Sequence, residues 1–448
     1  MEIEELKAKL RTTGVVGAGG AGFPTYAKLS SAAEVVILNS AECEPLLRVD
    51  RQLSKHYTEE ILKALELIVL TLKAEKGIFA IKSEYKEAIA SLKAVIYKFR
   101  NIEIKILENV YPAGDEVVLV YEATGKIVPE GSIPIAVGVV VVNTETVLNV
   151  YNSVFLDKPV TDKYVTITGE VNKPTTIKVP IGTSIMECIE LAGGTKLENF
   201  KIILGGPMTG RIGSLEEVIT KTSKAIIILP EEHSIILKRQ TRSSIKINRA
   251  MSVCSQCRMC TDLCPRYLLG HNIQPHRIMN ALANGLTSDI AAFTSASLCC
   301  GCGICENYAC YQGLAPSSII GELKVRLKEK GVKNTPSKIV SKVNLMREGR
   351  KVPMERLIAR LGLTKYNINA DLVDELYNAH KVVIKLSQHI GAPAITKVNV
   401  GDLVNVGDLI GEIEEGKLGT NIHASISGEI TKVDKKAITI EARGDING

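Results

Sequence analysis

The sequence predicts a multidomain protein of mixed class, α/β plus α+β, and three observations lead to this prediction. Its 448 residues are too many for one hydrophobic core, so three or four domains are expected. The apolar run 35–38 ends in polar residues, as buried parallel strands do where α/β folds bind ligands. Nine of the eleven cysteines fall between Cys254 and Cys310, which indicates a separate metal-binding module.

The composition excludes several classes of protein. Apolar residues make up 45% and charged residues 23% of the chain, as in ordinary globular proteins. The net charge of +6 is small and no dense basic run with aromatics occurs, so we expect no nucleic-acid partner. The longest apolar run, 133–142, is far shorter than the roughly 20 residues of a membrane span. The charged residues 1–12 lack a secretory signal core, so a cytoplasmic protein is expected.

The N-terminal segment combines a short helix with a glycine cluster. Ile3, Leu6 and Leu10 share one face of a predicted helix, which we expect to pack on its own domain. Docking of this helix to a shell or partner protein is the alternative. The stretch "GVVGAGGAGFPTYAKL" follows, with four glycines in six positions. Such a cluster is entropically costly and indicates either a loop that cradles a phosphate or a flexible turn.

The cysteines form two groups with ferredoxin spacing. The first, "CSQCRMCTDLCP", has the C-x2-C-x2-C-x3-C-P pattern of bacterial ferredoxins. The second, "CCGCGICENYAC", keeps the two-residue gaps only if Cys300 is out of phase, and Tyr311 stands where the ferredoxin proline would follow. In the crossed assignment, the fourth cysteine of each group binds the other cluster. The first cluster then has the ligands Cys254, Cys257, Cys260 and Cys310, and the second has Cys299, Cys302, Cys305 and Cys264.

Two zinc sites are the alternative interpretation of these cysteines. Zinc favours two separated C-x2-C pairs or mixtures of cysteine and histidine, and two triplets with two outlying cysteines fit that pattern badly. We therefore predict two [4Fe–4S] clusters, which together form a one-electron wire. The remaining thiols, Cys43, Cys188 and Cys300, are expected to be ordinary buried cysteines.

Four segments near the N-terminus carry a family resemblance. "GAGGAGFPTYAKL", "NSAECEP", "YPAGDE" and "VVNTET" resemble the flavin-binding segments of the NADH-oxidising subunit of respiratory complex I and of the RnfC component of Rnf complexes. The resemblance implies that the glycine loop holds the FMN phosphate, that the lysine supports the flavin and that the other motifs line the isoalloxazine. The residues so implied are Gly17, Gly19, Gly20, Gly22, Lys28, Asn39, Glu42, Glu44, Asn143 and Thr146.

Two positions depart from that family pattern. Ala18 stands where the complex I subunit has arginine, so the phosphate is expected to rely on backbone donors. Cys43 replaces a glycine between the two glutamates, which alters the side expected to receive nicotinamide. FMN converts the two-electron chemistry of NADH into the one-electron steps of the clusters, so NADH is the implied donor. No residue is required as a catalytic acid, base or nucleophile.

The rest of the chain predicts three further regions. The segment from Thr161, with a strand, a Gly169 turn and a Gly-Gly helix end, resembles a soluble-ligand-binding β-grasp (SLBB) domain, for which we expect a spacing role. The charged stretch 325–378 predicts a solvated helical connector. The short strands and G-D turns that follow resemble a barrel-sandwich hybrid, without the lysine motif of a swinging-arm carrier. The expected domains are an FMN- and NADH-binding α/β domain (1–155), the SLBB domain (160–232), a two-[4Fe–4S] ferredoxin-like domain (245–322), the helical connector (323–380) and an RnfC-like barrel-sandwich hybrid (381–446).

The order of these domains resembles the cobalamin reductases of propanediol-utilisation microcompartments. That family implies electron flow from NADH through FMN and both clusters to cobalamin, for a cobalamin adenosyltransferase. It also implies a location in the cytoplasm inside a bacterial microcompartment, with a shell protein as a further partner. The alternatives are an RnfC-like subunit of an electron-transport complex and a soluble relay to another anaerobic reductase.

Overall fold

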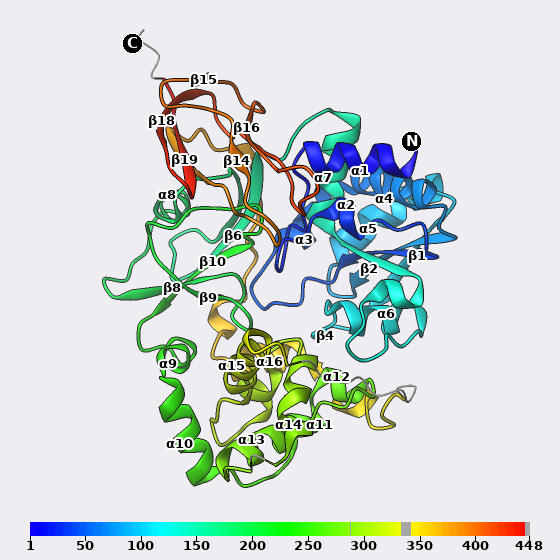
Figure 1. The fold of residues 1–448 in the computed structure, drawn as a ribbon, viewed down its shortest axis with the longest axis vertical. Helices are drawn as coiled ribbons and strands as arrows, with labels where there is room; N and C mark the ends of the chain where they lie inside the picture. Colours follow the sequence, from blue (N-terminus) through cyan, green and yellow to red (C-terminus); the bar gives the residue numbers. More distant parts are fainter. Residues whose placement is uncertain (287, 333–341, 444–448) are drawn as a thin grey trace.

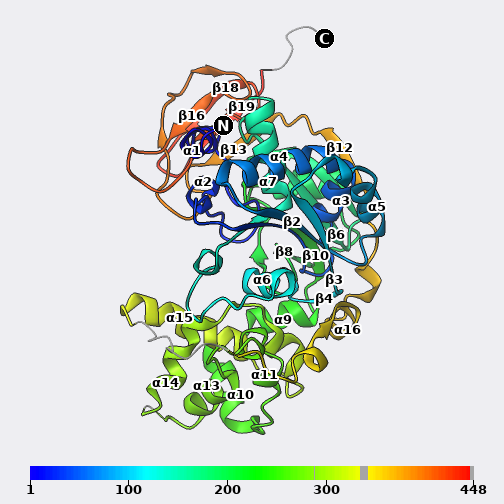
Figure 2. The ribbon, with the colours of Figure 1, turned by 90° about the vertical axis from the view of Figure 1, so that its right-hand side faces the viewer.

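The computed structural model of the protein describes residues 1–286, 288–332 and 342–443. In chain order, the described residues form an α/β domain, a β-grasp domain, a helical module and a C-terminal β domain. The helical module lies at one end of the molecule in both views, and the C-terminal β domain lies at the opposite end (Figure 1 and Figure 2). The α/β and β-grasp domains lie between these ends, where they contact each other.

A parallel sheet in the order β3-β2-β1-β5 is the centre of the first domain. Its strands are β1 (Val35–Ser40), β2 (Lys76–Lys82), β3 (Ile102–Leu107) and β5 (Val139–Asn143). The helices around it are α1 (Ile3–Thr12), α2 (Thr25–Lys28), α3 (Val49–His56), α4 (Thr58–Leu72), α5 (Lys86–Val95), α6 (Glu116–Thr124) and α7 (Thr144–Phe155), with 3₁₀ turns η1 (Ile96–Lys98) and η2 (Pro134–Val137). Alternate residues of β1 from Val35 to Leu38 pack on the two helical layers, which explains why this part of the strand is apolar.

The order of the strands places a crevice at one edge of this sheet. The chain runs outward from β1 through β2 to β3 on one side, and β5 lies on the other side of β1. The loops that follow β1 and β5 therefore separate at their carboxyl ends, where open α/β sheets bind ligands. The register pairs Asn39 with Asn143 at this edge.

The predicted N-terminal helix is confirmed and uses its apolar face within the first domain. Leu6 and Leu10 are fully buried in the core beneath α4 and α7, and Ile3 packs against the same core. None of the helices in the described ranges is long and apolar enough to cross a membrane.

The second domain contains a sheet in the order β12-β7-β6-β10-β8-β9. Its strands are β6 (Asp162–Gly169), β7 (Thr175–Pro180), β8 (Phe200–Leu204), β9 (Arg211–Gly213), β10 (Ala225–Pro230) and β12 (Leu372–Leu376), and α8 (Ile185–Leu191) packs against it. Ser184 caps α8 by accepting from the Glu187 N–H at 3.1 Å, which fixes where this helix begins.

The connector expected over 323–380 is only partly helical. Its described residues include α16 (Met354–Arg360), η5 (Glu348–Arg350) and η6 (Thr364–Tyr366), but also two strands. β11 (Val352–Pro353) pairs with β4 (Val110–Tyr111) of the first domain, and β12 extends the β-grasp sheet beside β7. The charged sequence concealed these strands because both are short edge strands, which bury few side chains. The part of this prediction that falls on 333–341 lies outside the described residues.

The helical module carries the cysteine-rich segment. Its elements are α9 (Ser234–Gln240), α10 (Ser243–Val253), α11 (Met259–Asp262), α12 (Pro265–Leu268), α13 (Pro275–Ala283), α14 (Ile290–Thr294), η3 (Ser295–Leu298), the π-helical turn η4 (Cys305–Ala309) and α15 (Pro316–Glu329). Two small apolar clusters between α10, α13 and α15 form its core. Ile304 and Ala309 of the module pack into a larger apolar cluster, together with residues of α9 and α16.

The C-terminal domain consists of two small antiparallel sheets around one apolar core. The first contains β13 (Lys381–Lys385), β19 (Ala437–Glu441), β18 (Gly428–Val433) and β15 (Leu403–Val404), and the second contains β14 (Ile395–Thr396), β16 (Leu409–Glu412) and β17 (Ile422–His423). The buried side chain of Lys221 fastens this domain to the others, because its Nζ donates to the carbonyls of Gly14 and Asn421, both at 2.8 Å.

Candidate cofactor sites

A cavity of about 740 Å³ lies at the crevice between β1 and β5. Nine of the ten residues predicted to bind FMN line it, namely Gly17, Gly19, Gly20, Lys28, Asn39, Glu42, Glu44, Asn143 and Thr146. Gly22 does not, because its Cα faces the β-grasp and C-terminal domains: a Cβ there would lie 2.6 Å from Thr222 Cγ2. Gly22 is therefore needed for the close approach of these domains, which the sequence pattern alone did not reveal.

The glycine loop is held from behind, so that its open side faces the cavity. The N–H of Gly17 donates to the carbonyl of Phe23 at 2.9 Å, which closes the loop. The Ala18 N–H donates to Thr146 Oγ1 at 2.9 Å, and the Lys163 ammonium donates to the Ala18 carbonyl at 3.1 Å. Gly20 has a left-handed φ of +63° and no protein atom within 4 Å of a Cβ position. This loop therefore fits a phosphate that is bound mainly by backbone donors.

Lys28 and Asn39 both line the cavity and both contact the "YPAGDE" segment. The Lys28 ammonium contacts Glu116 Oε1 at 2.7 Å and remains part-exposed toward the cavity. Asn39 donates to the carbonyl of Gly114 at 2.9 Å and accepts from the Ala41 N–H at 3.1 Å. Asn39 thus joins the loop after β1 to the "YPAGDE" loop, two segments that the sequence placed at the flavin.

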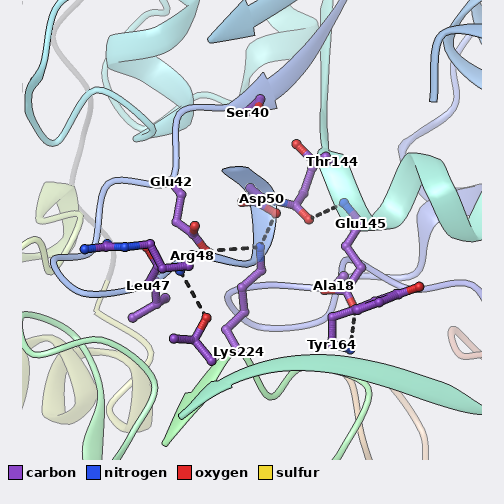
Figure 3. Close-up of polar contacts among 12 residues, drawn as sticks. Ala18, Ser40, Glu42, Leu47, Arg48, Asp50, Thr144, Glu145, Tyr164 and Lys224 are labelled. Atoms are coloured by element: carbon purple, nitrogen blue, oxygen red, sulfur yellow. Dashed lines mark hydrogen bonds and ion pairs between the residues drawn. The ribbon is translucent and has the colours of Figure 1, made fainter. Parts of the chain in front are cut away.

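A buried polar network forms the floor of the cavity (Figure 3). Asn143 Nδ2 donates to Asp50 Oδ2 at 2.9 Å, and the same carboxylate forms an ion pair with Lys224. Deeper in the network, Lys163 pairs with Glu145. Burial lowers the pKa of Lys224, but Asp50 and the other carboxylates around it raise that pKa by more, so the ammonium stays charged.

Sequence reasoning missed Asp50, Lys224, Lys163 and Glu145. Lys224 directly precedes the apolar strand β10, so the β-grasp domain, for which only a spacing role was expected, lines the cavity. A charged residue beside an apolar strand is too common in sequences to have identified this site.

Glu42 is the one carboxylate of this site whose oxygens have no hydrogen-bond partner among the described residues. It is 7% exposed and its Oε1 lies 3.9 Å from Lys224 Nζ. Burial, with a further contribution from Asp50, raises the pKa of Glu42 to about 7. An orphaned buried carboxylate on a cavity wall is costly unless a ligand partner completes it, which fits a cofactor that carries hydrogen-bond donors.

Glu44 lines the cavity and also contacts the β-grasp domain. Its carboxylate accepts from the Met208 N–H at 2.8 Å and from Thr209 Oγ1 at 2.6 Å. A Cβ at Gly206 would lie 2.0 Å from Glu44 Oε2, so the loop 204–213 must carry a glycine there. Glu44 therefore holds the β-grasp loop against the cavity, in addition to lining it.

Glu42→Gln is expected to make the flavin-free protein more stable at pH 8 but not at pH 5. The raised pKa of Glu42 gives stability that is present below about pH 4.5 and is lost as the pH rises to about 7. The loss amounts to about 3 kcal/mol at most, and the glutamine avoids it. Thermal unfolding of both proteins at the two pH values measures this difference. Glu415→Gln, at an exposed position, is the control and is expected to show no such dependence. A difference at pH 8 no larger than the control's would contradict the prediction.

The predicted ligand cysteines gather in two groups in the helical module. Burial and the neighbouring thiols of Cys257, Cys310 and Cys254 raise the pKa of Cys260 to about 12. A second, small cavity is lined by Cys264, Cys299, Cys300, Cys302 and Cys305. These neighbours include all the cysteines of the crossed assignment, and the second cavity contains Cys300 in addition. In the described part of the chain, no group of three or more His, Cys, Asp or Glu side chains is placed so that it could hold a metal ion.

The two cysteine loops share one backbone conformation. In the first, Gln256 and Arg258 have left-handed φ values of +57° and +65°. In the second, Gly301 and Gly303 have φ values of +73° and +76°. In each loop, the two left-handed residues come two and four positions after the first cysteine, which is Cys254 in the first loop and Cys299 in the second. When the loops are aligned on these positions, Cys300 corresponds to Ser255. Left-handed backbone at non-glycine residues is costly and persists where the surrounding structure requires it, which fits a loop wrapped around a cluster.

Contacts join the second cysteine group to the flavin cavity. Arg266, two residues after Cys264, forms an ion pair of 2.9 Å with Asp115. Asp115 caps α6 and lies between two cavity-lining residues of the "YPAGDE" segment. In addition, the Tyr111 hydroxyl donates to the Cys302 carbonyl at 2.6 Å. By contrast, Cys257 of the first group is exposed. The second group is therefore joined to a segment that lines the cavity, whereas the first group includes an exposed cysteine.

Four domain families match successive segments of the chain. The Nuo51 FMN-binding domain family matches residues 10–152 and the SLBB domain family matches 164–212. The 4Fe-4S dicluster domain family matches 253–315, and the RnfC barrel sandwich hybrid domain family matches 361–445. The protein thus binds FMN and two [4Fe–4S] clusters, in a fold that combines these four domains. The individual ligands and the domain boundaries stay predictions.

Comparison with known proteins extends over nearly the whole chain. "Cobalamin reductase PduS" of Salmonella typhimurium is 39% identical over 98% of this chain and 97% of its own length, and that of Citrobacter freundii is 37% identical over the same shares. The RnfC-type component of the Na(+)-translocating ferredoxin:NAD(+) oxidoreductase complex of Acetobacterium woodii is 32% identical over 62% of each chain. An NAD+-reducing [NiFe]-hydrogenase chain has a similar fold, with a TM-score of 0.50 and 19% identity over 75% of this chain and 64% of that chain. The protein is therefore an oxidoreductase that transfers electrons through flavin and iron–sulfur clusters, and it belongs to the PduS-type cobalamin reductase family.

Proposed function

We propose that the protein takes electrons from NADH and delivers them through FMN and both clusters to cobalamin. When bound, FMN accepts electrons as a pair and returns them singly, and the clusters carry them one at a time. Each NADH leaves as NAD+ and a proton after giving two electrons. These two electrons reduce one cob(III)alamin to cob(I)alamin, or two cob(II)alamins to cob(I)alamin.

The residues of this chain act by binding and positioning. The backbone of the glycine loop and Lys28 are assigned to the phosphate end of FMN. The orphaned Glu42 and the floor residue Asn143 are assigned to the flavin ring, and Lys224 keeps the floor charged. Thr146 holds the glycine loop through the Ala18 N–H, and Glu44 holds the β-grasp loop. No acid, base or nucleophile among these residues is needed.

The observation that carries the proposal is the pair of contacts between the flavin domain and the second cysteine group. The Arg266–Asp115 ion pair and the hydrogen bond from Tyr111 to Cys302 fix this group beside the cavity. We therefore assign the electron path from FMN to the second cluster and then to the first cluster. The exposed Cys257 marks the first cluster as the exit.

Stopped-flow mixing with NADH and then aquacobalamin tests the path. NADH is expected to bleach the flavin first and the clusters afterwards. Cys257→Ser is expected to leave flavin bleaching at the unmodified rate but to slow cobalamin reduction severalfold, because it removes a ligand of the exit cluster. Cys300→Ser, at an out-of-phase thiol, is the control and is expected to change neither rate.

Two results would contradict separate parts of the proposal. If NADH fails to bleach the flavin, NADH is not the electron donor. If the Cys257 variant reduces cobalamin at the unmodified rate, electrons leave before the first cluster and the clusters serve another partner.

An RnfC-like component of an electron-transport complex is the second candidate, favoured by the 32% identity to the Acetobacterium woodii relative. Stable binding to a membrane complex without corrinoid reduction would favour it. Reduction of cobalamin by the isolated protein, followed by transfer of the reduced cobalamin to an adenosyltransferase, would favour the cobalamin reductase function. From the family resemblance we also propose a location inside a cytoplasmic microcompartment, with a shell protein as partner.

A further inference from the structure

The helical module carries the entire positive charge excess of the protein. Residues 233–332 contain twelve Lys and Arg and five Asp and Glu, a net charge of +7, whereas the whole chain has +6. The remainder of the chain is therefore close to neutral, at −1. A charge asymmetry of this kind indicates a partner or surface of opposite sign at the charged region.

Most of this charge lies in one stretch that leads into the first cysteine loop. Between Glu232 and Asp262 the sequence has six Lys and Arg and no acidic residue. Two of the six have partners, because Arg239 donates to the carbonyl of Pro207 at 2.7 Å and Arg258 lies 3.8 Å from Asp262. The other four form no ion pair among the described residues, and together we call them the basic face: Lys238, Arg242, Lys246 and Arg249.

The basic face borders the predicted ligands of the first cluster. Lys238, Lys246 and Arg249 line a small hollow together with the buried Glu306, whose carboxylate accepts from Ser318, and with Gly313, whose N–H donates to the Cys310 carbonyl at 3.4 Å. The helix α10, which begins directly after Arg242 and carries Lys246 and Arg249, ends directly before Cys254. Figure 1 shows α9 and α10 along the outer edge of the module, with no other domain against α10. The cations thus lie on the elements next to Cys254 and Cys310, two predicted ligands of the first cluster.

Exposed apolar side chains lie beside these cations. Met251 and Val253 at the end of α10 are 59% and 48% exposed, and Tyr311 after Cys310 is 61% exposed. Apolar contact at the centre with charge at the rim is the usual composition of a transient protein interface.

Neutralisation of the bound clusters does not account for the basic face. The two clusters have the same ligand type and the same charge, so both would need cations. Near the second group, however, Arg266 is paired with Asp115, and Lys324, which donates to the Cys299 carbonyl at 2.7 Å, is a single cation without an ion pair among the described residues. Among the described residues, the unpaired cations of the basic face gather at the exposed first group, where an incoming molecule would meet them.

We propose that the basic face docks an acidic one-electron carrier protein, which takes electrons from the first cluster. This rests on the electron path proposed above, with the first cluster as the exit. In each transfer the cluster is oxidised by one electron and the carrier is reduced by one, with no bond made and no proton moved. One NADH thus supports the reduction of two carriers. Complementary charge raises the rate at which the carrier associates near the first cluster. The affinity of the complex stays low, as is usual for transient electron-transfer complexes.

Two haem proteins of opposite charge, used as acceptors from NADH-reduced holoprotein, test the proposal. Acidic cytochrome b5 is expected to be reduced at a second-order rate that falls by at least about tenfold between about 20 mM and about 300 mM salt. Basic cytochrome c is expected to be reduced slowly and to speed up with salt. The triple variant Arg242→Glu, Lys246→Glu, Arg249→Glu is expected to slow cytochrome b5 as much as high salt does. The control triple Lys432→Glu, Lys435→Glu, Lys436→Glu, in the exposed β18–β19 turn, is expected to leave that rate unchanged.

The outcomes separate this proposal from the proposed function. The docking proposal is overturned if the reduction rate of cytochrome b5 is the same at low and high salt and is unchanged in the basic-face variant. It is also overturned if the control triple variant slows cytochrome b5 reduction as much as the basic-face variant does. A different result is that the basic-face variant loses the ability to sediment with anionic lipid vesicles while it still reduces cytochrome b5 at the unmodified rate. That result would assign the basic face to a membrane and would also overturn the docking proposal. Flavin bleaching by NADH is followed in the same samples. Its failure in the unmodified protein would contradict the electron path instead.

Discussion

Replacing Cys302 with serine is expected to remove about half of the iron and acid-labile sulfide from the protein. Two [4Fe–4S] clusters hold about eight irons and eight sulfides, and each depends on four thiolates. Cys302 lines the second cysteine cavity with Cys264, Cys299 and Cys305, so its loss should abolish that cluster alone. Iron and sulfide analysis of anaerobically purified protein measures the loss, and the first cluster is expected to remain reducible by dithionite.

Cys300→Ser is the matched control, because it removes a thiol from the same cavity. The left-handed residues Gly301 and Gly303 repeat the positions of Gln256 and Arg258, which places Cys300 opposite Ser255 rather than opposite a ligand. A serine at 300 therefore restores the residue type of the first loop and should leave the iron content nearly intact. If Cys300→Ser halves the iron while Cys302→Ser does not, the phase assigned to the second loop is wrong. About one zinc and no sulfide in the unmodified protein would reject the clusters altogether.

Gly20→Val is expected to abolish stable FMN binding while sparing the clusters. Gly20 lines the cavity, and no protein atom lies within 4 Å of its Cβ position. The Cβ of a branched side chain there has room, and the side chain fills the space that we assign to the phosphate. FMN released by acid precipitation, measured against iron in the same sample, gives the occupancy, which should fall by at least about tenfold because a steric block costs several kcal/mol.

Gly125→Val controls for the backbone cost of that substitution. Gly125 ends α6 with a φ of +73°, close to the +63° of Gly20, and it too has no atom within 4 Å of a Cβ position. It does not line the cavity, so its replacement should leave FMN in place. Equal loss of FMN in both variants would show that strain in the fold causes the loss. Full FMN occupancy in the Gly20 variant would place the phosphate elsewhere.

Local patterns carried much of the prediction. The spacing of Cys254, Cys257, Cys260 and Cys264 reports on one short loop, whose geometry is set by residues adjacent in the chain, so the sequence was enough to identify it. The same holds for the helix of Leu6 and Leu10 and for the polar residues after β1. Such a motif can be recognised without knowing which other segments pack against it.

The sequence alone therefore determined the cofactor class, the four kinds of domain and nine of the residues that line the cavity. The tertiary structure decided which distant segments meet. It placed Lys224 and Asp50 under the cavity, turned Gly22 toward Thr222, engaged Glu44 with the β-grasp loop and set the second cysteine group beside Tyr111 and Asp115. It also converted part of the predicted connector into strands β11 and β12. The physical reason is that backbone periodicity and loop spacing are fixed by neighbours in the chain, whereas contacts between segments more than a hundred residues apart depend on how all the domains pack together.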